Sequence, residues 1–170
     1  MQQWTIEQAD IQIDLAAQKL YLPRFAKSYS ISSGKNGIGE IENSGKTPRG
    51  WHKVTQKIGA DTPLNSVFIA RQATGEIYSE SLAAEFPNRD WILTRILWLS
   101  GLEDGFNYGE GCDTYRRYIY IHGTPDTEPM GIPMSHGCIR MRNTDVAELF
   151  ELVSEDALVY ISEQPLNLTV

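Results

Sequence analysis

The stretch that most constrains this chain runs from Tyr118 to Met141 and reads YIYIHGTPDTEPMGIPMSHGCIRM. It contains His122 and His136, two of the chain's three histidines, and Cys138, one of its two cysteines. A thiol and two imidazoles gathered in one loop-rich segment are candidates for a single reactive site. The way this segment folds therefore decides what the chain can do.

Residues 117–122 alternate between polar and apolar side chains and are rich in tyrosine and isoleucine, which predicts a β-strand. Because side chains on a strand alternate between its faces, Tyr118, Tyr120 and His122 should share one face. Gly123 ends the predicted strand, and a loop with three prolines follows. We expect this loop to form a lid or the rim of a site.

Catalysis by Cys138 would need its thiolate, and a free cysteine thiol has a pKa of about 8.5. We predict that His122 is the base that removes the proton, because the loop returns the chain to the strand end. His136 is predicted either to support the catalytic residues from behind or to act on the oxyanion side. Backbone N–H groups around Gly137 and Cys138 would stabilise a tetrahedral oxyanion, and Arg140 would hold a substrate carboxylate in a two-pronged hydrogen bond.

Other interpretations of these residues stay open at this point. A lone cysteine is most often a small buried hydrophobic residue, and a lone histidine is more often structural than catalytic. His122, His136 and Cys138 are also three potential metal ligands, but no paired zinc spacing such as CxxC or HExxH occurs. We therefore expect no metal and no cofactor.

The segment HGT…PMSHGCIRM resembles the signature of the L,D-transpeptidase catalytic domain, the YkuD-type family. The upstream GKTPRGWHKV, the DTYRRYIYIHG around the predicted strand and the downstream RNTDVAELFELV are also similar to that family. The resemblance implies a β-sandwich that is mainly β with two helices. It also implies one catalytic domain over residues 1–170, with a core from about residue 10 to 162.

The resemblance further implies a cysteine enzyme that acts on peptidoglycan stem peptides. In the family, the cysteine at the place of Cys138 attacks the carbonyl of diaminopimelate, D-alanine leaves and a thioester remains. The histidine at the place of His122 is the base, and the carbonyl of Gly123 would orient its ring. The family positions that shape the oxyanion hole and substrate pocket correspond to Ser135, His136, Gly137 and Arg140. Tyr120, on the strand face of His122, is added as a substrate contact.

Charge and the first residues limit the expected partners and location. A net charge of −7 argues against nucleic acid and against anionic membrane surfaces. The start MQQWTIE has neither a basic n-region nor an apolar h-region, and no stretch approaches the ~18 apolar residues of a membrane helix. We therefore expect a cytoplasmic protein, with the periplasm as the alternative.

A cytoplasmic family member would meet soluble stem peptides during murein recycling. The expected activity is that of an L,D-carboxypeptidase, which removes the terminal D-alanine from murein tetrapeptides and other muropeptides through a Cys138 thioester. The alternatives are an L,D-transpeptidase that forms 3-3 cross-links or exchanges D-amino acids, and a non-catalytic domain that binds stem peptides. Carbapenems are expected covalent inhibitors. Cys112 is interpreted as incidental, although a regulatory Cys112–Cys138 bridge stays open.

The remaining chain is predicted from its apolar pattern. Strands are expected as a hairpin within 9–22, for which a helix is the alternative, and at 25–32, 51–58 and 157–161. A second hairpin is expected over 67–78 with its turn at Thr74–Gly75. Helices are expected at 90–100 and at 144–153, the latter capped by Asn143. His52 is expected to be exposed, and Gly45–Pro48 to be a structural turn.

Overall fold

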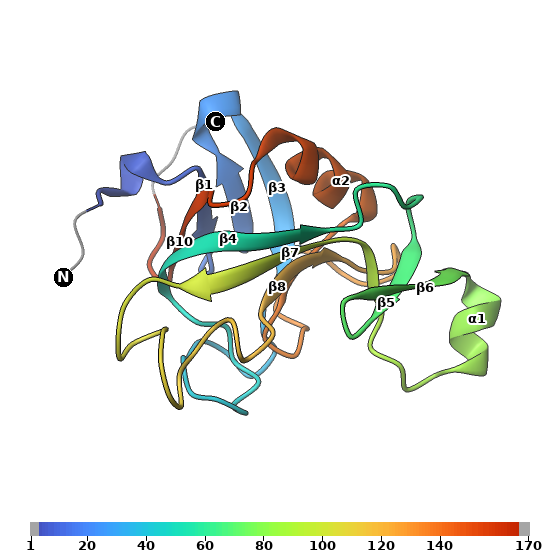
Figure 1. Cartoon of the computed structure of the whole chain (residues 1–170). Coiled ribbons are helices and arrows are strands. Elements are labelled where there is room, and N and C mark those ends of the chain that lie inside the picture. Colours follow the sequence, from blue (N-terminus) through green and yellow to red (C-terminus); the bar gives the residue numbers. More distant parts are fainter. Residues whose placement is uncertain (1–3, 167–170) are drawn as a thin grey trace.

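A single bent β-sheet dominates the computed structural model, which describes residues 4–166 (Figure 1). The strands are β1 (Ile11–Asp14), β2 (Lys19–Leu22), β3 (Lys27–Ser32), β4 (Gly50–Ile58), β5 (Ser66–Ile69), β6 (Gln72–Ile77), β7 (Ile92–Gly101), β8 (Tyr120–Gly123), β9 (Ile139–Met141) and β10 (Leu158–Ser162). The helices are α1 (Glu80–Glu85) and α2 (Asn143–Leu152), with short 3-10 turns η1 (Ile6–Gln8) and η2 (Pro23–Phe25).

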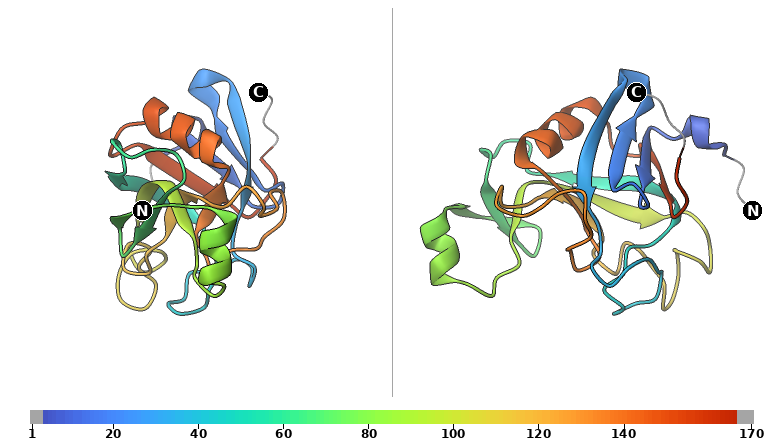
Figure 2. Two further views of the ribbon diagram at one scale, coloured as in Figure 1. Left: turned by 90° about the vertical axis from the view of Figure 1, so that its right-hand side faces the viewer. Right: turned by 180° about the vertical axis from the view of Figure 1, so that it is seen from behind.

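The sheet closes on itself. Its strand order is β4-β10-β1-β2-β3-β9-β8-β7-β5-β6, and β4 also pairs with β7. The strands from β4 round to β7 therefore form a ring, while the β5–β6 hairpin and α1 project from it (Figures 1 and 2). Most pairs are antiparallel, but β8 runs parallel to β9 and β1 parallel to β10.

The main hydrophobic core lies inside this ring and is covered by α2. It combines fully buried isoleucines and leucines of the strands with Val146, Leu149 and Phe150 of the helix. These helix residues follow the i, i+3, i+4 spacing that places apolar side chains on one face. The predictions of a mainly β fold with two helices and of a helix at about 144–153 are confirmed.

The predicted helix at 90–100 is wrong, because this segment is β7. The strand pairs with β4 and β8 along much of its length and with β5 at its start, and most of its residues are buried. A strand covered on both faces has apolar residues in succession, and such a run cannot be told from a buried helix by periodicity. The second helix is instead α1, whose first turn is capped by Ser79, since its Oγ accepts a hydrogen bond from Leu82 N at 3.1 Å.

Three local predictions also need correction. The turn of the second hairpin lies at Ala70 and Arg71, both with positive φ (49° and 64°), and not at Thr74–Gly75. His52 is fully buried. Asn143 does not cap α2, whose N-cap is Arg142.

The strand that carries His122 begins later than predicted. β8 starts at Tyr120, and Tyr118 adopts a left-handed φ of 57° before it. Tyr118 therefore does not continue the strand face of Tyr120 and His122, and its side chain is 52% exposed.

Candidate active site

Two parallel strands bring the predicted site residues onto one face. In the register of β8 and β9, His122 lies opposite Arg140 and Ile121 opposite Ile139. Side chains alternate along each strand, so Tyr120, His122, Cys138 and Arg140 share one face of this pair. The intervening isoleucines point into the core. The parallel crossover thus joins residues that the sequence separates by the proline-rich loop.

Cys138 is half-buried just before β9. Its Sγ accepts a hydrogen bond from Tyr120 N at 3.3 Å and donates one to Tyr118 O at 3.3 Å. Burial raises the pKa of the Cys138 thiol to about 12, against the opposing effect of the Tyr120 amide. The thiol is therefore protonated at neutral pH.

The turn before Cys138 is fixed from inside by Ser135. Ser135 Oγ donates to Cys138 O at 2.6 Å and accepts from Gly137 N at 3.1 Å. Gly137 has a φ of 121°, a conformation that residues with a Cβ rarely adopt. A Cβ there would also lie 3.1 Å from Lys46 O.

These contacts decide which amides are available for an oxyanion. The Gly137 N–H is occupied by Ser135, so it is not the donor that the sequence suggested. In the part of the chain that the structure describes, the N–H groups of His136 and Cys138 donate to no protein acceptor. We assign these two amides as the candidate oxyanion donors.

The long loop between β3 and β4 supports the same turn from outside. Thr47 Oγ1 donates to Gly137 O at 2.8 Å and accepts from Gly34 N at 2.8 Å. Gly45–Pro48 is thus a structural turn that holds the cysteine segment. The sequence predicted the turn but not this contact.

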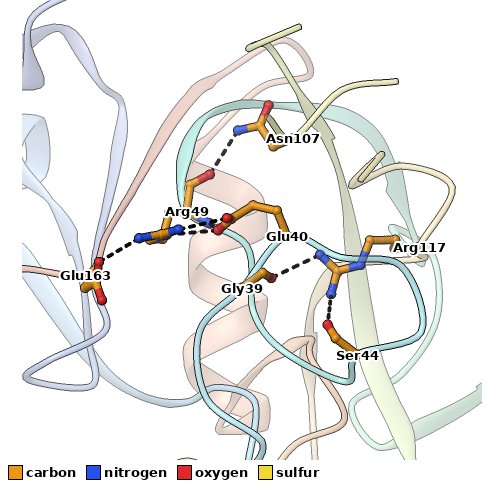
Figure 3. A network of polar contacts seen from close by, with 7 residues as sticks. All are labelled: Gly39, Glu40, Ser44, Arg49, Asn107, Arg117 and Glu163. Atoms are coloured by element: carbon orange, nitrogen blue, oxygen red, sulfur yellow. Dashed lines mark hydrogen bonds and ion pairs between the residues drawn. The ribbon is translucent and has the colours of Figure 1, made fainter. Parts of the chain in front are cut away.

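Two arginines fasten that loop (Figure 3). Arg49 donates to both carboxylate oxygens of Glu40 at 2.9 Å and to Glu163 at 2.8 Å. Arg117 donates to Gly39 O at 3.3 Å and to Lys46 O at 2.5 Å. The half-buried Arg117 also favours the thiolate of Cys138, although burial of the thiol outweighs this effect on its pKa.

His122 is buried, and its Nδ1 lies 2.6 Å from Gly123 O. Because a carbonyl only accepts, Nδ1 carries the proton and Nε2 has the free lone pair. Burial lowers the pKa of His122 below its ordinary value. The ring is therefore a neutral base at neutral pH.

Gly123 has no room for a side chain. A Cβ there would lie 2.6 Å from Leu93 O and closer still to the side chain of Asn143. Asn143 accepts from Thr94 Oγ1 at 2.5 Å and donates to Thr124 O at 2.9 Å. The backbone on both sides of the Gly123 carbonyl is thus fixed, and only that carbonyl can orient the imidazole.

Arg140 and His136 meet acidic residues that the sequence did not single out. Arg140 lies 3.4 Å from Asp90 and 3.8 Å from Glu128, and His136 Nδ1 lies 3.5 Å from Asp90. These four side chains line a cavity of about 190 Å³. The positive charge of Arg140 is thus already balanced by nearby carboxylates, and a substrate carboxylate would have to displace Asp90. The His136 side chain is 77% exposed and points to this cavity.

Other potential ligands do not gather at the site. Cys112 and Cys138 are both free thiols, and Cys112 Sγ instead lies 3.6 Å from Gly109 O. Among residues 4–166 there is no cluster of three or more histidine, cysteine, aspartate or glutamate side chains arranged to hold a metal ion. None of the helices in that range is long and apolar enough to cross a membrane.

Curated relatives share a short part of this chain. It is 40% identical over 53 residues to the probable L,D-transpeptidase YbiS of Escherichia coli K12, which covers 31% of this chain and 17% of the relative. It is 42% identical over 53 residues to the probable L,D-transpeptidase ErfK/SrfK of the same strain, with the same coverage. The match therefore spans less than a fifth of each relative.

Solved structures share the fold over nearly the whole chain. A structure of the Ldtfm-avibactam carbamoyl enzyme aligns with a TM-score of 0.54 at 19% identity, over 94% of this chain and 51% of the other. L,D-transpeptidase 3 from Mycobacterium tuberculosis aligns with a TM-score of 0.51 at 17% identity, over 90% and 60%. The model of the L,D-transpeptidase catalytic domain, YkuD, matches residues 8–161. With this match over most of its length, the chain belongs to the L,D-transpeptidase catalytic-domain family.

Proposed function

We propose that this protein is a cysteine L,D-carboxypeptidase that removes the terminal D-alanine from soluble murein tetrapeptides. The observation that carries the proposal is the pairing of a thiol and a neutral imidazole on one face of β8 and β9. Cys138 is fixed by its turn, and His122 is oriented by a carbonyl that leaves Nε2 free. A domain that only bound peptides would need neither group.

Acylation follows from these protonation states. Nε2 of His122 takes the thiol proton as Sγ of Cys138 attacks the carbonyl of the third stem residue. The two candidate amides, of His136 and Cys138, stabilise the oxyanion. The imidazolium then returns the proton to the departing nitrogen, so D-alanine leaves and a thioester remains.

Water completes the reaction. His122 takes a proton from water, the hydroxide adds to the thioester, and the tripeptide leaves as the thiol regains its proton. The thiol is half-buried and donates to Tyr118 O, and the Tyr118 ring lies 4.7 Å from the guanidinium of Arg71 at the β5–β6 hairpin tip. A water molecule reaches such a thioester more easily than a second stem peptide does, which supports hydrolysis.

The family itself favours a second candidate, the L,D-transpeptidase, in which an amine takes the place of water. Mass spectrometry of a soluble tetrapeptide with the purified protein separates the two, with and without a D-amino acid. Hydrolysis predicts loss of one alanine, uptake of one oxygen from H₂¹⁸O and little effect of the added amine. Exchange of the terminal residue, or a dimer, would support the transpeptidase instead.

We also propose that the site accepts carbapenems. Relatives of known structure include an L,D-transpeptidase in complex with imipenem and another with a faropenem-derived adduct. Intact-mass analysis should show one covalent imipenem on the wild type and none on Cys138→Ala.

We propose further that the protein acts in the cytoplasm. Fractionation of cells that make the protein from its own gene tests the location, and recovery in the periplasm would overturn this proposal.

A further inference from the structure

Two arginines border the site, and their charges are balanced differently. Arg140 is 8% exposed and lies beside Asp90 and Glu128. Arg71 forms no ion pair with any carboxylate of residues 4–166. Of the two, Arg71 is the cation that still lacks an anionic partner.

Arg71 is held at the site by aromatic side chains. It lies at the tip of the β5–β6 hairpin, where it donates to Tyr120 Oη at 3.2 Å. Its guanidinium also lies 4.7 Å from the ring centre of Tyr118 and 5.1 Å from that of Trp98. Contacts of this kind fix a guanidinium and remove part of its hydration while leaving its charge unpaired.

The same tyrosines contact the thiol through their backbone. Tyr120 N donates to Cys138 Sγ, and the thiol donates to Tyr118 O, both at 3.3 Å. The residues that hold the guanidinium are therefore the residues that flank the nucleophile. An anion bound by Arg71 would therefore be separated from the nucleophile by about the length of one tyrosine side chain.

The substrate of the proposed reaction carries an anion close to the attacked bond. In a peptide that ends one residue after the attacked carbonyl, the terminal carboxylate is separated from that carbonyl by a single residue, about 3.3–3.6 Å of extended chain. Arginine binds carboxylates through two parallel hydrogen bonds. One further residue would move the carboxylate by the same distance again.

We propose that Arg71 binds the C-terminal carboxylate of the residue that leaves, and so restricts the enzyme to peptides with one residue after the attacked bond. The inference rests on the proposed function and names the substrate feature that its site reads. It moves carboxylate recognition from Arg140, which the sequence suggested, to a hairpin tip that carries no sequence signal for this role.

Steady-state kinetics with three soluble peptides test this: the tetrapeptide, its C-terminal carboxamide, and the pentapeptide. Arg71→Gln should lower kcat/KM for the tetrapeptide by about 10- to 100-fold, mainly through KM, as expected for loss of a charged hydrogen-bond pair. On the carboxamide it should act like the wild type, and Arg71→Lys should recover part of the loss. An equal loss on tetrapeptide and carboxamide would show that Arg71 only holds the hairpin, and would overturn the proposal.

Arg140→Gln is the matched control, because it removes a guanidinium from the same face. It should change activity on the tetrapeptide and on the carboxamide by the same factor. If instead Arg140→Gln loses the tetrapeptide alone while Arg71→Gln does not, Arg140 is the carboxylate anchor and the proposal is wrong.

Binding to an inactive protein separates this inference from the proposed function. With Cys138→Ala, calorimetry should show tighter binding of the tetrapeptide than of its carboxamide, and the added Arg71→Gln change should abolish the difference. If the wild type turns over no tetrapeptide, the proposed function fails, yet this binding difference still decides the role of Arg71. Equal binding of both peptides would overturn it.

Discussion

His52 and His122 are alike in most respects that sequence and electrostatics can measure. Both lie on strands and are buried, at 0% and 2% exposure. In both, Nδ1 donates to a backbone carbonyl, of Gly50 at 3.0 Å and of Gly123 at 2.6 Å. Burial lowers the pKa of both rings. Burial and a shifted pKa therefore do not single out the base.

The second ring nitrogen separates them. Nε2 of His52 lies 2.9 Å from Thr114 Oγ1, so this ring is satisfied on both sides. Nε2 of His122 has no hydrogen-bond partner within residues 4–166. This atom is not fully buried, since the buried polar atoms without a partner in that range are Gln12 Oε1 and Arg95 Nε. The His122 side chain lies on the face that carries Cys138. The candidate base thus differs from the structural histidine in one respect: its Nε2 has no hydrogen-bond partner among the described residues.

The largest expected effect is on turnover. His122→Gln removes the base and should lower kcat by about 10²- to 10⁴-fold, the usual contribution of a positioned general base. His52→Gln should keep turnover within a few-fold of the wild type, since within residues 4–166 its ring forms hydrogen bonds with Gly50 and Thr114 and with no residue of the candidate site. Kinetics with circular dichroism as a folding control test the pair. Similar losses of activity in two folded variants would abolish the distinction.

For the free energy of unfolding, we expect His52 to matter more than His122. The pKa of His52 is lowered from 6.5 to about 4, so the folded state keeps the ring neutral while the unfolded state binds a proton below pH 6.5. The contribution is complete above pH 6.5 and is lost as the pH falls towards 4. It amounts to about 3 kcal/mol at 1.36 kcal/mol per pKa unit.

Urea unfolding at several pH values measures this term. The wild type should lose free energy of unfolding between pH 6.5 and 4, and His52→Gln should lose about 3 kcal/mol less over that window. His122, whose pKa is also lowered, acts in the same direction and is unchanged in this variant. Equal slopes for the two proteins would show that His52 does not resist protonation.

The smallest effect is the pH dependence of kcat/KM. Because His122 must be neutral to accept a proton and its pKa is lowered, kcat/KM should rise with pH through a midpoint below 6.5 and then stay level near pH 7. The Cys138 thiol, with a pKa of about 12, should add no step between pH 7 and 9. A rate that keeps rising across that range would point to free thiolate as the attacking species.

Local sequence patterns predicted the parts of this fold that local forces determine. Alternating apolar residues gave the hairpin within 9–22 and the strand at 51–58, and the i, i+3, i+4 stripe gave α2. Residues 92–101 misled the prediction because both faces of this strand are covered: Leu97 and Leu99 lie in the main core, and Ile96 and Trp98 in a second hydrophobic cluster. Periodicity is lost when a strand has no exposed side.

Partners that are distant in sequence could not be predicted. His52 alternates with Val54 on a strand and suggested exposure, but Thr114 covers it from 62 positions away. The ion pair of Asp90 with Arg140 joins positions 50 apart. The pair His122 and Cys138 could be predicted from the sequence because a family signature contains both residues. The contact of Arg71 with Tyr120 could not, because it depends on how the β5–β6 hairpin projects from the ring of strands.

The most direct test of the central claim is intact-mass spectrometry of the protein quenched with acid during turnover of the tetrapeptide. The account predicts an adduct with the mass of the acyl tripeptide, located on Cys138 by peptide mapping. The adduct should be absent in Cys138→Ala and retained in Cys112→Ser. Turnover without any adduct, or an undiminished rate in Cys138→Ala, would contradict the account.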